Sequence, residues 1–173
     1  MKKSLYQAIA LSTGLLLSGS ALAEVTGNIG ATSNYLWRGT TQTNDAAAVQ
    51  GGIDYAHDSG FYAGTWVSNV DFGDETSYEL DLYGVSGASD ETDWSYIQAN
   101  ASFPLTEKLS VAFHYGYSQG DVVEDLFGDT YADYNVTLSA ETDIGTVSFM
   151  AADTDLPDND AKVVLGYSYG FTL

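Results

Sequence analysis

A strict alternation of residue types near the C-terminus is the feature that most limits the fold. From Val163 to Leu173, bulky apolar residues occupy every second position, and mostly small residues fill the positions between them. Successive side chains of a β-strand point to opposite faces, so this run predicts a strand with one apolar face. Helical spacing is weak throughout, whereas the alternation recurs at 109–118 and 132–140 and, less completely, at 25–38, 49–55, 78–82 and 146–151. We therefore expect an all-β chain, with further strands of ambiguous facing at 61–70 and 94–103.

The N-terminal residues predict export. Lys2 and Lys3 precede a mostly apolar stretch of ten residues, and Ala21-Leu22-Ala23 places small residues where a signal peptidase reads them. This pattern is typical of a secretory signal peptide, and the apolar stretch is too short for a membrane-spanning helix. An uncleaved anchor is the alternative. We expect a signal peptide at 1–23 and a single β-barrel domain at 24–173.

The residues after the signal are strongly acidic. Arg38, Lys108 and Lys162 stand against 24 Asp and Glu, which is a formal charge of −21. Such a chain repels phosphate backbones, so we expect no nucleic-acid partner. It contains no Cys, which excludes disulfides and thiolate metal sites. The 13 Tyr, 7 Phe and 3 Trp of the full sequence argue against disorder.

Strand and loop lengths indicate the architecture. The alternating runs are about 9 to 11 residues long, as tilted transmembrane strands are, and tight turns alternate with the longer acidic loops 39–47, 119–129 and 153–160. A membrane protein made of strands must close into a barrel, because lipid offers no hydrogen-bond partners for the backbone N–H and C=O groups of an open strand edge. We expect a single antiparallel transmembrane β-barrel in the cell outer membrane, with the long loops outside the cell. Nine candidate strands can be counted and the alternation slips between 84 and 93, so we expect eight strands, with ten as the alternative.

The direction of the apolar faces has two interpretations. A soluble lipocalin-type barrel would turn them inward. Aromatic residues near strand ends, including Tyr35, Trp37 and Tyr117, favour lipid on the outside, as in the aromatic girdles of outer-membrane barrels. The chain also ends in its most regular strand, so we expect contact with the barrel-assembly machinery through that strand, and contact with outer-membrane lipid and lipopolysaccharide.

Several stretches resemble the TorF-like porin family of bacterial outer-membrane β-barrels. They include Ser33 to Gln42, Ala48 to Tyr55 and Gly60 to Trp66, then Ser68 to Phe72 and Tyr78 to Gly84, and, after the slip, Tyr96 to Pro104 with parts of 114–134. The resemblance implies an outer-membrane barrel with a porin role. This chain resembles a shortened member that lacks about three strands just after Gly84. The loss of an odd number of strands coincides with the slip in alternation.

The expected interior carries charge. The alternation predicts that four acidic side chains and one basic side chain face the lumen: Asp54, Glu79, Asp81, Asp133 and Arg38. One interpretation is a porin-like barrel for passive diffusion of small, cationic solutes. The other is a closed barrel with a structural or surface-contact role, because eight strands leave room for little more than side chains. For Arg38 we expect a carboxylate partner, Asp54, Glu79 or Asp81, or else a hydrated position at the outer end of its strand.

The sequence offers little for catalysis. His57 and His114 are its only imidazoles, and no nucleophile elbow, HExxH pair or phosphate-cradling loop is present. We expect no enzymatic activity, no catalytic residues, no cofactor and no metal site. The acidic run Asp153 to Asp160 has oxygen ligands for Ca²⁺, but it lacks the Gly and the distant Glu of an EF-hand, so a solvated loop is the preferred interpretation.

Overall fold

The computed structural model describes residues 24–57, 61–73, 76–84, 95–157 and 159–173. The predicted signal peptide at 1–23 lies outside these residues, as do the predicted turn at 58–60 and residues 85–94, where the alternation in the sequence slips.

Strands dominate the described chain. The long strands are β1 (Glu24–Thr32), β4 (Ala48–Ala56), β5 (Tyr62–Asn69), β6 (Tyr78–Gly84), β7 (Ser95–Pro104), β8 (Leu109–Gln119), β9 (Tyr131–Thr142), β10 (Gly145–Thr154) and β11 (Lys162–Thr172). Two short strands, β2 (Leu36–Trp37) and β3 (Thr40–Thr41), form a separate hairpin, and one helix, α1, covers Asp121–Phe127. The all-β expectation is confirmed. No helix in the described part of the chain is long and apolar enough to cross a membrane.

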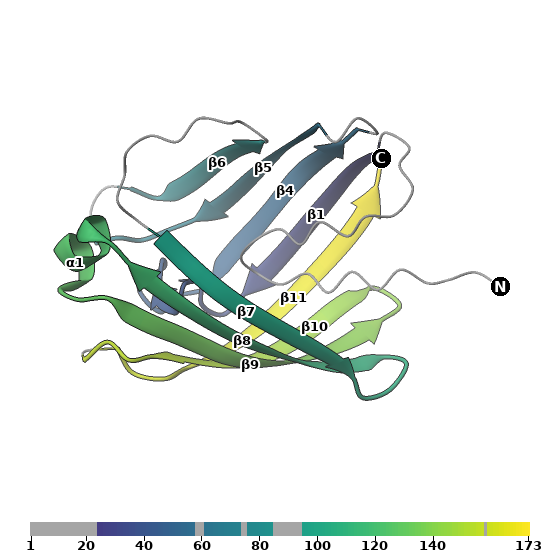
Figure 1. Ribbon diagram of the computed structural model, residues 1–173. Coiled ribbons are helices and arrows are strands. Elements are labelled where there is room, and N and C mark those ends of the chain that lie inside the picture. Colours follow the sequence, from purple (N-terminus) through teal and green to yellow (C-terminus); the bar gives the residue numbers. More distant parts are fainter. Residues whose placement is uncertain (1–23, 58–60, 74–75, 85–94, 158) are drawn as a thin grey trace.

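The nine long strands form one sheet. Its order is β6-β5-β4-β1-β11-β10-β9-β8-β7, and each of these neighbouring strands pairs with the next in antiparallel fashion. The pairing of β1 with β11 joins the two ends of the described chain, so the sheet curves round on itself (Figure 1). The expected count of eight strands is wrong for the described residues, because all nine candidates enter the sheet. The sheet has two edges, β6 and β7, rather than the expected closed ring.

The predicted alternation decides which face of the sheet is apolar. In β11, Val163 and Leu165 are 63% and 57% exposed, whereas Val164 between them is 2% exposed. The outward apolar positions predicted in β8 and β9, such as Phe113 and Val136, are exposed as well. The apolar residues therefore lie on the convex outer face, and the lipocalin-type arrangement with an apolar interior is not the one adopted.

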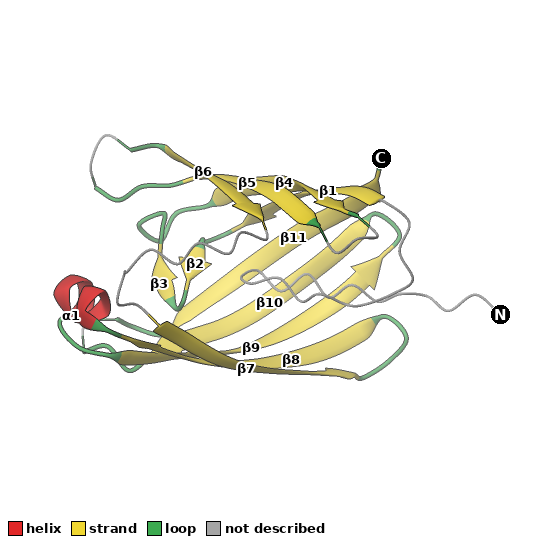
Figure 2. Ribbon diagram, turned by 45° about the horizontal axis from the view of Figure 1, so that its top comes forward, coloured by secondary structure: helices red, strands yellow, loops and turns green. Residues whose placement is uncertain are grey.

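Residues 33–47 fold into the concave side of the sheet (Figure 2). We call this segment the inner hairpin. The chain turns at the end of β1, where the Thr32 hydroxyl donates to the Asn34 carbonyl at 2.9 Å. Within the inner hairpin, Gln42 N donates to Tyr35 O at 2.8 Å. Asp71 N, outside the hairpin, donates to Gln42 O at 2.8 Å and ties the hairpin to the end of β5.

This inward fold corrects two expectations. The segment 39–47 is not an outer loop, and Tyr35 and Trp37 do not continue the outer face of β1. Tyr35 is buried against Ala48 and Val70, with Trp37 packed beside them. The alternation ends at Thr32, because the side chain–backbone bond there replaces the strand ladder.

Helix α1 was not predicted, because 119–129 reads as an acidic loop. The helix lies between Gly120 and Gly128, and the φ of +84° at Gly128 ends it in the left-handed conformation. Its Val123 is fully buried, and the Phe127 ring lies 5.0 Å from the ring of Tyr131. Tertiary contacts thus stabilise a seven-residue helix that is too short to be stable alone.

Candidate functional site

The inner hairpin places Arg38 inside the sheet. Trp37 pairs with Thr40, and the two residues between them have positive φ, 48° for Arg38 and 78° for Gly39. This geometry is that of a two-residue hairpin turn, and Gly at the second position favours it. A Cβ on Gly39 would lie 3.0 Å from the Asp133 Cβ, so the turn also packs closely against β9.

Arg38 lies between two aromatic rings. Its guanidinium carbon is 4.3 Å from the centre of the Trp37 ring and 4.1 Å from that of Tyr96 on β7, within the range of cation–π attraction. Burial lowers the pKa of Arg38, while Tyr96, Tyr131 and Asp133 act in the opposite direction. Among the described residues, Asp133 is the carboxylate whose charge acts on Arg38. The partners predicted from the sequence were Asp54, Glu79 and Asp81, but Arg38 lies in a turn beside Trp37 rather than on a strand.

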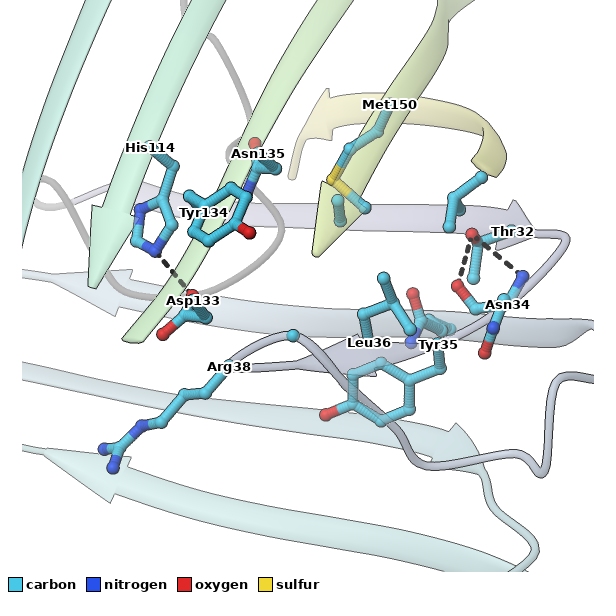
Figure 3. Close-up of a pocket in the computed structure, with 14 residues that line it drawn as sticks. Thr32, Asn34, Tyr35, Leu36, Arg38, His114, Asp133, Tyr134, Asn135 and Met150 are labelled. Atoms are coloured by element: carbon cyan, nitrogen blue, oxygen red, sulfur yellow. Dashed lines mark hydrogen bonds and ion pairs between the residues drawn. The ribbon is translucent and has the colours of Figure 1, made fainter. Parts of the chain in front are cut away.

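Asp133 is the centre of a hydrogen-bonded network. Its side chain is 3% exposed, and its Oδ1 is 2.9 Å from His114 Nε2 on β8. The Tyr96 hydroxyl donates to Asp133 Oδ2 at 2.9 Å and lies 2.9 Å from His114 Nε2. The other ring nitrogen, His114 Nδ1, is 2.7 Å from Asn100 Oδ1. Three neighbouring strands therefore bring a carboxylate, a phenol and an imidazole together near the guanidinium. Figure 3 shows the Asp133 and His114 side chains of this network.

Asp54 belongs to a second network on β4, β5 and β6, at the other end of the strand order. The hydroxyls of Tyr62 and Tyr83 donate to Asp54 Oδ1 at 2.5 and 2.8 Å. Gly64 on β5 lies between Asp54 on β4 and Tyr83 on β6. A Cβ on Gly64 would be 2.5 Å from Asp54 Oδ1 and 2.7 Å from Tyr83 Cζ. Gly116 has the same role between Asp133 and Tyr96. In both networks a glycine on the middle strand lets a tyrosine reach across it to an aspartate.

The remaining predicted residues lie on β6. Glu79 is half-buried, and burial of Tyr35 and the negative charge of Glu79 raise the pKa of Tyr35. Asp81 is exposed. The structure therefore brings Arg38 and Asp133 together, but it divides the other three acids between the Asp54 network and the edge strand.

Sequence reasoning missed Tyr96, Asn100 and the role of His114. The facing of 94–103 was ambiguous, and an isolated strand histidine is usually structural. One sequence feature could have indicated the role of His114. The alternation in 109–118 places His114 on the inner face, on the same side as Gly116 two residues later.

A small cavity lies beside this network. Its volume is about 30 Å³, and it is lined by the inner hairpin and by residues of β1, β4 and β8 to β11, including Arg38, His114, Asp133, Asn135, Met150 and Val164. A cavity of this size holds about two waters. No group of three or more His, Asp and Glu side chains in the described residues is arranged to hold a metal ion.

The acidic run 153–160 uses two of its carboxylates locally. Asp155 Oδ1 accepts from Ala132 N at 2.7 Å, and Asp153 Oδ1 accepts from Thr154 N at 2.9 Å. Asp158 lies outside the described residues.

The glycine in the Asp133 network provides a stability prediction. A Cβ at Gly116 would lie 2.6 Å from Asp133 Oδ2 and closer still to the Tyr96 hydroxyl. We expect Gly116→Ala to displace Tyr96 and to lower the free energy of unfolding by about 1–3 kcal/mol, measured by urea titration in detergent micelles. Gly170→Ala is the matched control, because its Cβ would meet nothing closer than Gly27 O at 3.9 Å. Equal effects of the two changes would contradict this packing.

An ion pair attaches the inner hairpin to β11. Lys162 Nζ lies 2.9 and 3.0 Å from the two carboxylate oxygens of Asp45, and Asn34 Nδ2 donates to the same carboxylate at 2.7 Å. The hydrogen bond from Lys162 is the main cause that lowers the pKa of Asp45. The pair joins residues 117 positions apart, so it holds the inner hairpin close to the start of β11.

This pair predicts a pH dependence. Because the folded pKa of Asp45 is lowered, its contribution is present above the ordinary carboxyl value of about 4 and is lost as the pH falls through the lowered value. We expect faster amide exchange in the inner hairpin of Asp45→Asn than of the wild type at pH 7, and no difference below the folded pKa. Lys162→Gln should match Asp45→Asn, and the double variant should add nothing. A difference between wild type and Asp45→Asn that persists at low pH would contradict the assignment.

Comparison with known proteins gives one match. Residues 18–89 match a family described as "Bacterial protein of unknown function (Gcw_chp)", and this region includes the inner hairpin and β1 to β6. No curated protein matches the chain. No solved structure matches it either.

Proposed function

We propose that this protein is an outer-membrane β-barrel with a porin-like role in the passive diffusion of small solutes. The observation that carries the proposal is the apolar outer face, which extends over all nine long strands. Its exposed large residues include Ile29, Val49, Ile53, Val67, Leu80, Leu82, Ile97, Phe103, Phe113, Val136, Leu138, Val147, Phe149, Val163 and Leu165. Monomeric soluble proteins rarely expose apolar patches on this scale, whereas lipid-facing barrel walls require them.

The polar inner face supports the same proposal. Buried polar residues such as Gln50, Ser68, Ser118 and Asp133 point into the concave side. This distribution inverts that of a soluble protein and suits a chain with lipid outside and a hydrated interior. The proposal includes contact with outer-membrane lipid and lipopolysaccharide, insertion through the C-terminal strand by the barrel-assembly machinery, and no enzymatic role.

The charges of the interior favour cationic solutes. Asp54, Glu79, Asp81 and Asp133 outnumber Arg38 on the inner face, and acidic linings favour cations in channels. Arg38 and the inner hairpin lie across the interior, so we place the narrowest part of the path there.

A closed barrel with a structural or surface-contact role is the second candidate. It is favoured by the inner hairpin, which occupies the interior, and by the small size of the cavity beside it.

Fractionation and planar-bilayer recording test the proposal. We expect the chain in outer membranes, a heat-modifiable band on unboiled gels and cation-selective single-channel currents. Arg38→Ala should shift the reversal potential further towards cations, because it removes a positive charge from the acidic inner face. A chain released as a soluble periplasmic protein would refute the membrane role, and a membrane-inserted chain without current would favour the closed barrel.

A further inference from the structure

We infer that the two edge strands, β6 and β7, pair with each other in parallel and close the sheet into a nine-stranded barrel. This pairing rests on the proposed membrane location, and it makes each edge strand the hydrogen-bonding partner of the other. Barrels of bacterial outer membranes normally have an even number of strands and only antiparallel neighbours, so a parallel seam is a specific departure.

The pairings determine the relative direction of the edges. Eight antiparallel steps lead from β6 through β5, β4, β1, β11, β10, β9 and β8 to β7. Each step reverses direction, so an even number of steps leaves β6 and β7 pointing the same way, as Figure 1 also shows. Any direct contact between these two edges along their length is therefore a parallel pair.

Both edge strands carry the apolar outer face. Leu80 and Leu82 on β6 are 58% and 77% exposed, and Ile97 and Phe103 on β7 are 65% and 54% exposed. These side chains place both strands at the depth of the lipid. Unpaired N–H and C=O groups are not tolerated there, so the two edges need a partner with a free edge.

The inner hairpin contacts both edge strands from inside. The charge of Glu79 on β6 acts on the Tyr35 hydroxyl, and the Arg38 guanidinium lies over the ring of Tyr96 on β7. Tyr35 and Arg38 are only three positions apart in one short segment, so β6 and β7 flank the same small element. This arrangement brings the two edges towards each other across the inner hairpin.

The connection is long enough for a parallel return. Ten residues separate Gly84 from Ser95. Fully extended, they span about 33–36 Å, whereas a return along the seven residues of β6 needs about 23 Å. The chain therefore permits β7 to start beside the beginning of β6.

A second copy would not remove the parallel seam. Two copies in one membrane are related by rotation about the membrane normal, which leaves strand directions unchanged. An edge of one copy would meet an edge of the other in parallel, and two such seams would be needed. Closure within one chain needs a single seam, so we assign it to one chain.

Cysteine cross-linking tests the seam, because the chain has no native Cys. Leu80→Cys is combined in turn with Cys at the outward positions of β7, namely Ile97, Ala99, Ala101 and Phe103, and the variants are oxidised in intact cells before fractionation. Val111→Cys with Leu138→Cys, which are register partners on β8 and β9, is the positive control. Leu80→Cys with Val147→Cys on β10 is the negative control.

We expect an intrachain disulfide for one or two of the four combinations, with a yield close to that of the positive control. Covalent dimers would overturn the inference in favour of a second copy. No product at any of the four positions, with the positive control cross-linked, would also overturn it. Fractionation of the same variants reports the membrane location independently, so a cross-linked chain found outside the membrane would refute the proposed function and leave the seam in place.

Discussion

Arginine at Val136 should lower the free energy of unfolding by about 2–4 kcal/mol when the protein is studied in lipid vesicles. Val136 is exposed on the outer face of β9, and its register partners are Phe113 on β8 and Ala151 on β10. If that face meets lipid, a guanidinium near the middle of the strand must leave water for hydrocarbon. Unfolding by urea, monitored by tryptophan fluorescence and by gel mobility, measures the change.

The neighbouring positions provide the controls. Leu138 is on the same face and should behave as Val136 does, whereas Thr137 between them faces the interior. We expect Leu138→Arg to be strongly destabilising and Thr137→Arg to have a much smaller effect. If all three positions tolerated Arg equally, the outer face would not be in lipid.

Removal of the inner hairpin should increase single-channel conductance several-fold. Thr32 and Ala48 are direct register partners on β1 and β4, so an Asn-Gly turn can replace residues 33–47 without a change of register. The variant loses the segment that crosses the interior, including Arg38 and Trp37. Planar-bilayer recording measures the conductance, and we also expect lower stability, because Tyr35 and Thr43 lose their buried positions.

A point change within the hairpin is the control for that deletion. Asn44 is exposed and has a positive φ of 50°, so Asn44→Gly fits its backbone and should leave the conductance unchanged. A folded deletion variant with the conductance of the wild type would mean that the hairpin does not line the path. Current in the deletion variant alone would mean that the wild type is a closed barrel.

Individual residues explain where sequence reasoning succeeded. The outward phase of Phe113, Val136 and Val163 was read correctly, because a strand places alternate side chains on opposite faces wherever its ladder is intact. The nine strand candidates were also present in the sequence, and the slip in alternation after Gly84 corresponds to edge strands that run in the same direction.

The candidate site was harder to predict, because its members come from separate elements. Asp133 was predicted to face inward, but its contacts with His114, Tyr96 and Arg38 depend on the order of β7, β8 and β9 and on the inner hairpin. The hairpin itself departs from the alternation at Thr32, where one side-chain hydroxyl redirects the backbone. Helix α1 depends on the burial of Val123, which no local pattern indicates.

The sequence by itself therefore determined the strands and their apolar face, because both depend on the alternation of side chains along single strands. Tertiary structure decided what fills the interior, which groups meet there and how the sheet ends. Those features depend on contacts between residues far apart in the chain, such as Asp45 with Lys162 and Arg38 with Tyr96. The free energy of such contacts belongs to the packed arrangement, and no stretch of sequence contains it alone.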